Sequence, residues 1–161
     1  MSHPEFLARV RALLDVGRND EALGLLMPAS MNSSSSQLHG LIVVTLSRLG
    51  RAAEAAQAAE RGLALAGLEP SLACTASYAF LGTKQHAKAL AAAQAAVDGA
   101  PGWTPALLAL ATMQSAMGKR KVAAAAVETA LGLSSEDANT HITAGAVATD
   151  ARCYKAAKAH Y

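Results

Sequence analysis

The stretch Met117-Gly118-Lys119-Arg120-Lys121-Val122-Ala123-Ala124 contains the pattern that decides the fold. An apolar residue precedes a glycine, a short polar segment follows, and an alanine-rich run comes next. The pattern recurs three times earlier in the chain. The intervals between the four glycines are 33, 32 and 36 residues, for Gly17, Gly50, Gly82 and Gly118. A period of about 34 residues with one glycine in each unit is typical of stacked helix–turn–helix repeats.

Each glycine is expected to end a helix, because glycine adopts a positive φ without a Cβ penalty. The predicted first helices lie near 5–16, 36–48, 70–81, 104–117 and 137–149. The predicted second helices lie near 19–27, 52–66, 86–98, 120–132 and 152–161. The repeat units span roughly 3–35, 36–67, 68–103, 104–137 and an incomplete 138–161, all within one domain, 1–161.

The composition supports an all-α chain. Apolar residues make up 52% of the 161 residues, and many are alanine, which has the highest helix propensity. The net charge of +2 and the aromatic content of 4% do not indicate a nucleic-acid-binding surface. The most apolar stretch, 41–46, is too short to span a bilayer, so no membrane insertion is predicted. No signal peptide is recognised, and we expect a cytoplasmic location.

The repeat resembles the tetratricopeptide repeat, as found in bacterial repeat domains. The fourth unit matches that pattern at Leu107, Leu110, Ala111, Gly118, Ala123 and Ala130. In the third unit the matching residues are Cys74, Thr75, Tyr78, Gly82, Ala89, Ala96 and Pro101, with about two extra residues between Gly82 and Ala89 that predict a longer turn. The second unit matches at Ile42, Leu46, Gly50 and Ala55, and the first mainly at Gly17 and Ala22. In the second unit Val43 replaces a smaller residue and Gly62 replaces an alanine.

The resemblance implies a right-handed superhelical α-solenoid of antiparallel helix pairs, with a concave wall made by the first helices. By the family's register the groove residues are Arg11, Asp15, Gln37, Val44, Ser47, Arg48, Leu72, Ala76, Phe80, Leu108, Thr112, Ser115, Asn139, Ile142 and Thr149. Phe80 and Arg48 are the best anchor candidates, because aromatic and arginine side chains dominate binding hot spots. The alternative for Phe80 is that it packs in the core between helices.

Such a groove suits an extended peptide or an amphipathic helix of a partner protein, so the leading hypothesis is a protein-interaction scaffold. Two alternatives are a secretion-type chaperone that holds a small export substrate and a regulatory domain of a larger enzyme. The fifth unit stops at Tyr161 without a polar capping helix. The chain is therefore expected to be a fragment of a longer protein or to be covered by another chain, and self-association through this end is a further hypothesis.

No catalytic, cofactor or metal site is predicted. The five histidines show no trusted ligand spacing with one another, with cysteine or with carboxylates: His3, His39, His86, His141 and His160. Cys74 and Cys153 are interpreted as two free thiols. The basic run Lys119-Arg120-Lys121 lies at a predicted turn and is interpreted as solvated.

Overall fold

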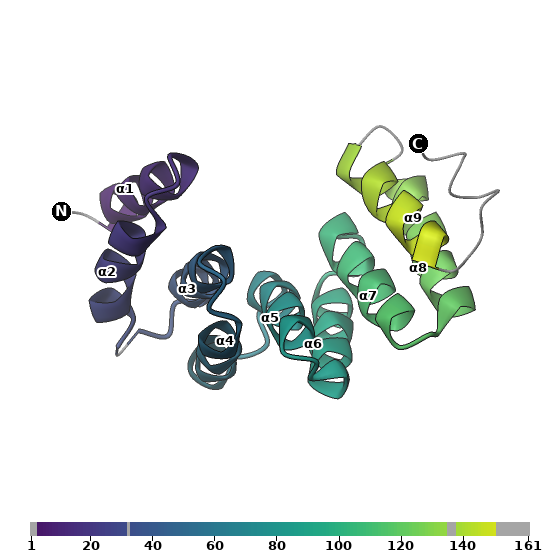
Figure 1. Ribbon diagram of the computed structural model, residues 1–161, viewed down its shortest axis with the longest axis horizontal. Helices are drawn as coiled ribbons and strands as arrows, with labels where there is room; N and C mark the ends of the chain where they lie inside the picture. Colours follow the sequence, from purple (N-terminus) through teal and green to yellow (C-terminus); the bar gives the residue numbers. More distant parts are fainter. Residues whose placement is uncertain (1–2, 32, 135–137, 151–161) are drawn as a thin grey trace.

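A computed structural model describes residues 3–31, 33–134 and 138–150 of the chain. This part folds into helices alone, in the order shown in Figure 1. The helices are α1 (His3–Asp15), α2 (Asn19–Ser30), α3 (Ser36–Arg48), α4 (Ala52–Ala66), α5 (Pro70–Gly82), α6 (His86–Gly99), α7 (Thr104–Ala116), α8 (Arg120–Leu133) and α9 (Ala138–Asp150). The all-α prediction is confirmed. The predicted helix 152–161 lies outside the described residues, and so does the end through which self-association was expected.

The helices form an arc of antiparallel pairs (Figure 1). Each odd-numbered helix packs against the even-numbered helix that follows it, and each even-numbered helix packs against the next pair. The odd-numbered helices also contact one another, α3 with α5, α5 with α7 and α7 with α9. From α3 to α9, one side of the solenoid is therefore a continuous row of first helices.

Alanine makes the close helix crossings possible. Ala55, Ala89 and Ala123 occupy the same position in three successive second helices, and each is fully buried. Larger aliphatic side chains from neighbouring units fill the space around them and extend the core from Leu7 to Met113. Since one repeat cannot cover its own apolar face, the units stabilise one another.

The turn of the third unit corrects the sequence-based assignment. Gly17, Gly50 and Gly118 adopt φ values of 76°, 72° and 73°, but in the third unit the left-handed residue is Lys84, with φ 60°. Gly82 is the last residue of α5. The intervals between the left-handed residues are therefore 33, 34 and 34 residues, which is more regular than the glycines alone suggested.

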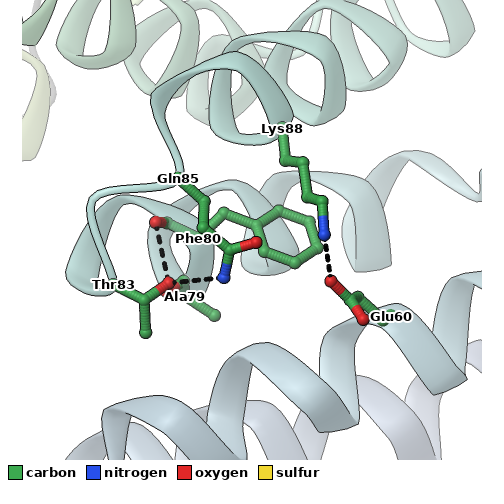
Figure 2. Close-up of polar contacts among 6 residues, drawn as sticks. All are labelled: Glu60, Ala79, Phe80, Thr83, Gln85 and Lys88. Carbon is green, nitrogen blue, oxygen red and sulfur yellow. Dashed lines mark hydrogen bonds and ion pairs between the residues drawn. The ribbon is translucent and has the colours of Figure 1, made fainter.

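The third turn is also not longer than the others. Each left-handed residue lies five positions before the buried alanine of the second helix, Ala89 in the third unit. The next residue donates its backbone N–H to the carbonyl five residues earlier, as in Gln85 to Phe80 at 2.9 Å and Arg51 to Leu46 at 2.9 Å. Such 6→1 bonds satisfy carbonyls at the end of a helix. Thr83 Oγ1 donates to the Phe80 carbonyl at 3.1 Å and accepts from Gln85 Nε2 at 2.9 Å, which holds this turn without a glycine (Figure 2).

The correct turn shifts the register of the third unit by two residues. Ala76, Ser77 and Phe80 take the repeat positions that the sequence analysis had matched to Cys74, Thr75 and Tyr78, and all three are buried. Ser77 is fully buried, and its hydroxyl donates to the Cys74 carbonyl at 2.7 Å. Within the described ranges, no helix is both long enough and apolar enough to cross a membrane.

Candidate functional site

An open hollow of about 710 Å³ lies on the side formed by the first helices, over α5, α7 and α9. Its side chains come from successive units at equivalent positions, with the α6–α7 loop and the end of α8 at one edge. The lining residues are Cys74, Tyr78, Gly102, Trp103, Thr104, Pro105, Leu108, Ser134, Ile142 and Thr143. A second hollow, of about 270 Å³, is lined by Thr112, Ser115, Ala116, Thr143, Ala146 and Val147. The two hollows share Thr143, and together they are called the α5–α7–α9 groove below.

Four of the predicted groove residues line these hollows: Leu108 and Ile142 the larger one, Thr112 and Ser115 the smaller one. Leu108, Thr112 and Ser115 belong to the fourth unit, in which the turn glycine was assigned correctly. Ile142 belongs to the fifth unit, which follows it. The structure places Ile142 with 60% of its surface exposed. Leu108 and Ser115 are largely covered and contribute mainly to the floor.

The third-unit residues predicted for the groove lie elsewhere. Leu72 and Ala76 are fully buried, and Phe80 is 3% exposed, so these side chains belong to the core. The two-residue shift caused by Lys84 is the reason. The residues of α5 that line the groove are instead Cys74 and Tyr78, which the sequence analysis had matched to other positions of the repeat pattern. Counting five residues back from Ala89 in the second helix, as in the other units, would have placed the turn at Lys84 and revealed this register.

Phe80 faces the second helices. Lys88 of α6 holds its Nζ 5.9 Å from the centroid of the Phe80 ring, and the same Nζ forms an ion pair with Glu60 of α4. Figure 2 shows the ring beside this pair. The alternative interpretation of Phe80, packing between helices, is therefore the one that the structure supports.

Arg48 also has a structural contact. Its Nη1 donates to the Leu14 carbonyl at 3.0 Å, so a cation lies at the C-terminal end of α1, where the helix dipole favours positive charge. The remaining predicted residues of α1 and α3 lie outside the two hollows: Arg11, Asp15, Gln37 and Ser47 are exposed and Val44 is half-buried. The side chains of Asn139 and Thr149 lie outside the described residues.

The α5–α7–α9 groove carries no ionised side chain from α5 or α7. Neither helix contains an Asp, Glu, Lys or Arg. Burial raises the pKa of the Cys74 thiol to about 11. Burial also raises the pKa of Tyr78; the Cys74 thiol adds to this rise, and a hydrogen bond with Thr112 opposes it. Both groups are therefore neutral at physiological pH.

The buried histidine of α3 has a structural partner as well. His39 is 3% exposed, and its Nε2 lies 2.7 Å from the Ser33 carbonyl, which ties the α2–α3 loop to the helix. Among the described residues, no three His, Cys, Asp or Glu side chains are close enough to hold a metal ion together.

These features define an α-solenoid of paired helices with a period near 34 residues and an uncharged groove on its first helices. The structure is similar to TTC0263, a thermophilic TPR protein of Thermus thermophilus, with a TM-score of 0.83, 20% identity, and 99% and 88% of the two chains covered. It is also similar to MamA residues 41–end from Desulfovibrio magneticus RS-1, with a TM-score of 0.75, 21% identity, and coverage of 98% and 89%. A third similar structure is YrrB, described as a TPR protein with an unusual peptide-binding site (TM-score 0.69, 17% identity, coverage of 96% and 80%).

The chain therefore has the tetratricopeptide repeat fold. No family model matches its sequence, and no curated protein matches it.

Proposed function

We propose that this chain is a protein-interaction scaffold that binds an uncharged, apolar segment of a partner protein in the α5–α7–α9 groove. The observation that carries the proposal is the groove itself. It is an open hollow of about 710 Å³ whose two long helices, α5 and α7, have no charged residue. Tyr78 and Ile142 border it with 45% and 60% of their surfaces exposed.

The chemistry of the lining selects the partner. A charged side chain entering this groove loses hydration and gains no counterion from α5 or α7, which is costly. An apolar side chain gains about 25 cal/mol for each Å² of apolar surface removed from water. Tyr78 supplies a large aromatic surface and Thr112 and Thr143 supply hydroxyls, a combination that accepts both apolar side chains and a peptide backbone.

The similar folds support this direction. YrrB is described as having an unusual peptide-binding site, and the present chain has a similar fold. The anchors proposed for this chain are its own residues Tyr78 and Ile142, in place of Phe80 and Arg48, which contact other parts of the solenoid.

A peptide selection tests the proposal. The protein is panned against a displayed library of random dodecapeptides, and the enriched peptides are measured by fluorescence anisotropy. We expect enriched peptides with fewer charged residues than the starting library. We also expect the dissociation constant to change less than about twofold between 50 mM and 500 mM salt, because no ion pairs are screened.

The substitution Ile142→Glu places a charge in the groove and should weaken binding of the selected peptides at least about tenfold, since an unpaired carboxylate must be buried. Val122→Glu is the matched control, because Val122 is 53% exposed and lies on α8, outside the groove. Equal loss in both variants, or none in Ile142→Glu, contradicts the groove assignment. Groove-dependent selection of highly charged peptides contradicts the proposed partner chemistry alone.

A further inference from the structure

The opposite side of the solenoid, formed by the second helices, contains equivalent junctions between neighbouring units. Leu46 and Phe80 occupy the same position in the second and third units, because each carbonyl accepts the N–H of the residue after the left-handed turn. Counting from the left-handed residues, Glu54 is equivalent to Lys88, and Met27 is equivalent to Glu60. At the α2–α4 junction these three positions are held by Leu46, Glu54 and Met27. At the α4–α6 junction they are held by Phe80, Lys88 and Glu60.

The α4–α6 junction is closed. The Phe80 ring fills the space between the helices and is 3% exposed. Lys88 lies over the ring and forms an ion pair with Glu60 of the neighbouring unit. Figure 2 shows these three side chains, which come from α5, α6 and α4, meeting at one point.

The α2–α4 junction has a different set of side chains and stays open. Leu46 is smaller than phenylalanine, and Met27 cannot form an ion pair with Glu54. Glu54 instead accepts hydrogen bonds from Arg51, the residue just before its own helix, at 2.7 and 2.6 Å. A hollow of about 260 Å³ remains between the helices. Its lining includes the apolar Leu23, Met27, Ile42, Leu46 and Ala58 and three charged residues, the paired Arg51 and Glu54 and, in addition, Arg61.

We propose that this hollow is a second binding site, which takes an aromatic side chain of a partner protein with a carboxylate next to it. The α4–α6 junction shows that this backbone frame accepts a phenyl ring between neighbouring units. At the α2–α4 junction the smaller Leu46 takes that position, which leaves the hollow unfilled. The site lies on the side of the second helices, so it is independent of the α5–α7–α9 groove and of the function proposed for it.

The residues around the hollow suit that occupant. Met27 is 48% exposed, and methionine is unbranched and packs well against aromatic rings. Arg61 donates its Nη2 to the Met31 carbonyl at 3.0 Å, and no carboxylate in the described part of the chain forms an ion pair with it. A guanidinium beside the hollow can therefore stack on the ring and bind the adjacent carboxylate.

The experiment uses N-acetyl-L-phenylalanine, which carries a phenyl ring and a carboxylate, as the probe. Methyl spectra of the ¹³C-methyl-methionine-labelled protein report binding. We expect the probe to shift the Met27 methyl resonance upfield, with a dissociation constant of about 1–10 mM for a ligand of this size. The Met117 resonance, from the α7–α8 turn, should not move. N-acetyl-L-leucine should bind at least about fivefold more weakly, because it has no ring on which the guanidinium can stack.

Two variants fill the hollow from different sides. Leu46→Phe copies the α4–α6 junction from the core side, and Ala58→Leu fills the hollow from α4. Ala126→Leu is the matched control, since Ala126 holds the same position in α8 and is also half-buried. Helicity and melting temperature show whether each variant folds. If Leu46→Phe does not fold, Ala58→Leu still tests the proposal.

We expect both filled variants to lose the Met27 shift, and Ala126→Leu to keep it. Arg61→Gln should weaken N-acetyl-L-phenylalanine about two- to fivefold, the usual range for one exposed ion pair. It should weaken the neutral N-acetyl-L-phenylalaninamide less, because the amide keeps the ring but has no carboxylate. The proposal is overturned if the parent shows no Met27 shift at about 20 mM probe, well above the expected constant. It is also overturned if a folded filled variant binds as well as the parent, or if the leucine probe binds equally.

Discussion

The second and third repeats have the same backbone path but different means of holding it. Both turn through a left-handed residue, Gly50 in the second unit and Lys84 in the third, with the same 6→1 hydrogen bond. Their cores differ: the third unit has Phe80 where the second has Leu46, and the second has Gly62 where the third has Ala96. Position in the repeat decides the role of a residue, and side-chain size decides how the neighbouring units meet.

The first prediction removes the aromatic ring that distinguishes the third repeat. Phe80→Ala should lower the free energy of unfolding by about 3–5 kcal/mol, because a buried phenyl ring is lost and a cavity remains. Chemical denaturation of the parent and the variant measures the difference. Phe80→Leu, which copies the second repeat, should cost clearly less. A cost below about 1 kcal/mol for Phe80→Ala would show that the α4–α6 junction does not depend on the ring.

The second prediction concerns Cys74, a residue of the third repeat that lines the α5–α7–α9 groove. The second repeat contributes no lining residue to that groove. Burial raises the pKa of Cys74 from 9.0 to about 11, and the thiolate is the reactive form. Alkylation of Cys74 at pH 8 should therefore be about 100-fold slower than that of an ordinary thiol, and should rise about tenfold per pH unit up to the shifted pKa. The measurement uses Cys153→Ser, which leaves Cys74 as the only cysteine. Urea-unfolded protein, in which the rate should return to the ordinary value, is the control.

The third prediction concerns the close helix crossing at Gly62 in the second repeat. A Cβ at Gly62 would lie 2.7 Å from His39 Cβ, which is attached directly to the backbone of α3 and cannot swing away. Gly62→Ala should therefore destabilise the chain by about 1–3 kcal/mol, despite the higher helix propensity of alanine. Gly132→Ala, in α8 with no atom near the added Cβ, is the matched control and should not destabilise. Equal effects in thermal unfolding would contradict the crossing argument.

The fourth prediction exchanges the turn residues. Lys84→Gly should raise the free energy of unfolding by about 1 kcal/mol or slightly less, because a side chain with φ near 60° is strained and glycine is not. Gly50→Lys should have the opposite sign in the same urea titration. If Lys84→Gly also destabilises the chain, the prediction is wrong. The Lys84 side chain would then support the hydrogen bonds of Thr83 and Gln85 in addition to setting the backbone conformation.

The smallest effect is expected for the ion pair between the repeats. Glu60→Gln should cost about 0–1 kcal/mol, because Glu60 and Lys88 are about half exposed and water screens them. A double-mutant cycle with Lys88→Met measures the coupling, which should decrease as salt is added. A coupling above about 2 kcal/mol, or one that is independent of salt, would show that the pair is far less solvated than its exposure indicates.

Most of the fold could be predicted from the repeat. The period, the glycine turns and the alanine positions are local signals, so the helix boundaries agree with the prediction to within a few residues from α1 to α9. The error was also local in origin: Gly82 was taken as the turn because glycine is the usual left-handed residue. Lysine takes that conformation here because neighbouring hydrogen bonds and the fixed distance to Ala89 require it.

The candidate site was only partly predictable, because a shift of two residues on a helix moves a side chain to a different face. Leu108 and Ile142 line the hollow, whereas Phe80 and Arg48 contact residues of other helices, Lys88 of α6 and the Leu14 carbonyl of α1. The sequence by itself determined the repeat, the helical class and the lack of charge on α5 and α7. Tertiary structure alone decided which side chains meet across units, because those contacts depend on side-chain size and pairing between helices and not on the period.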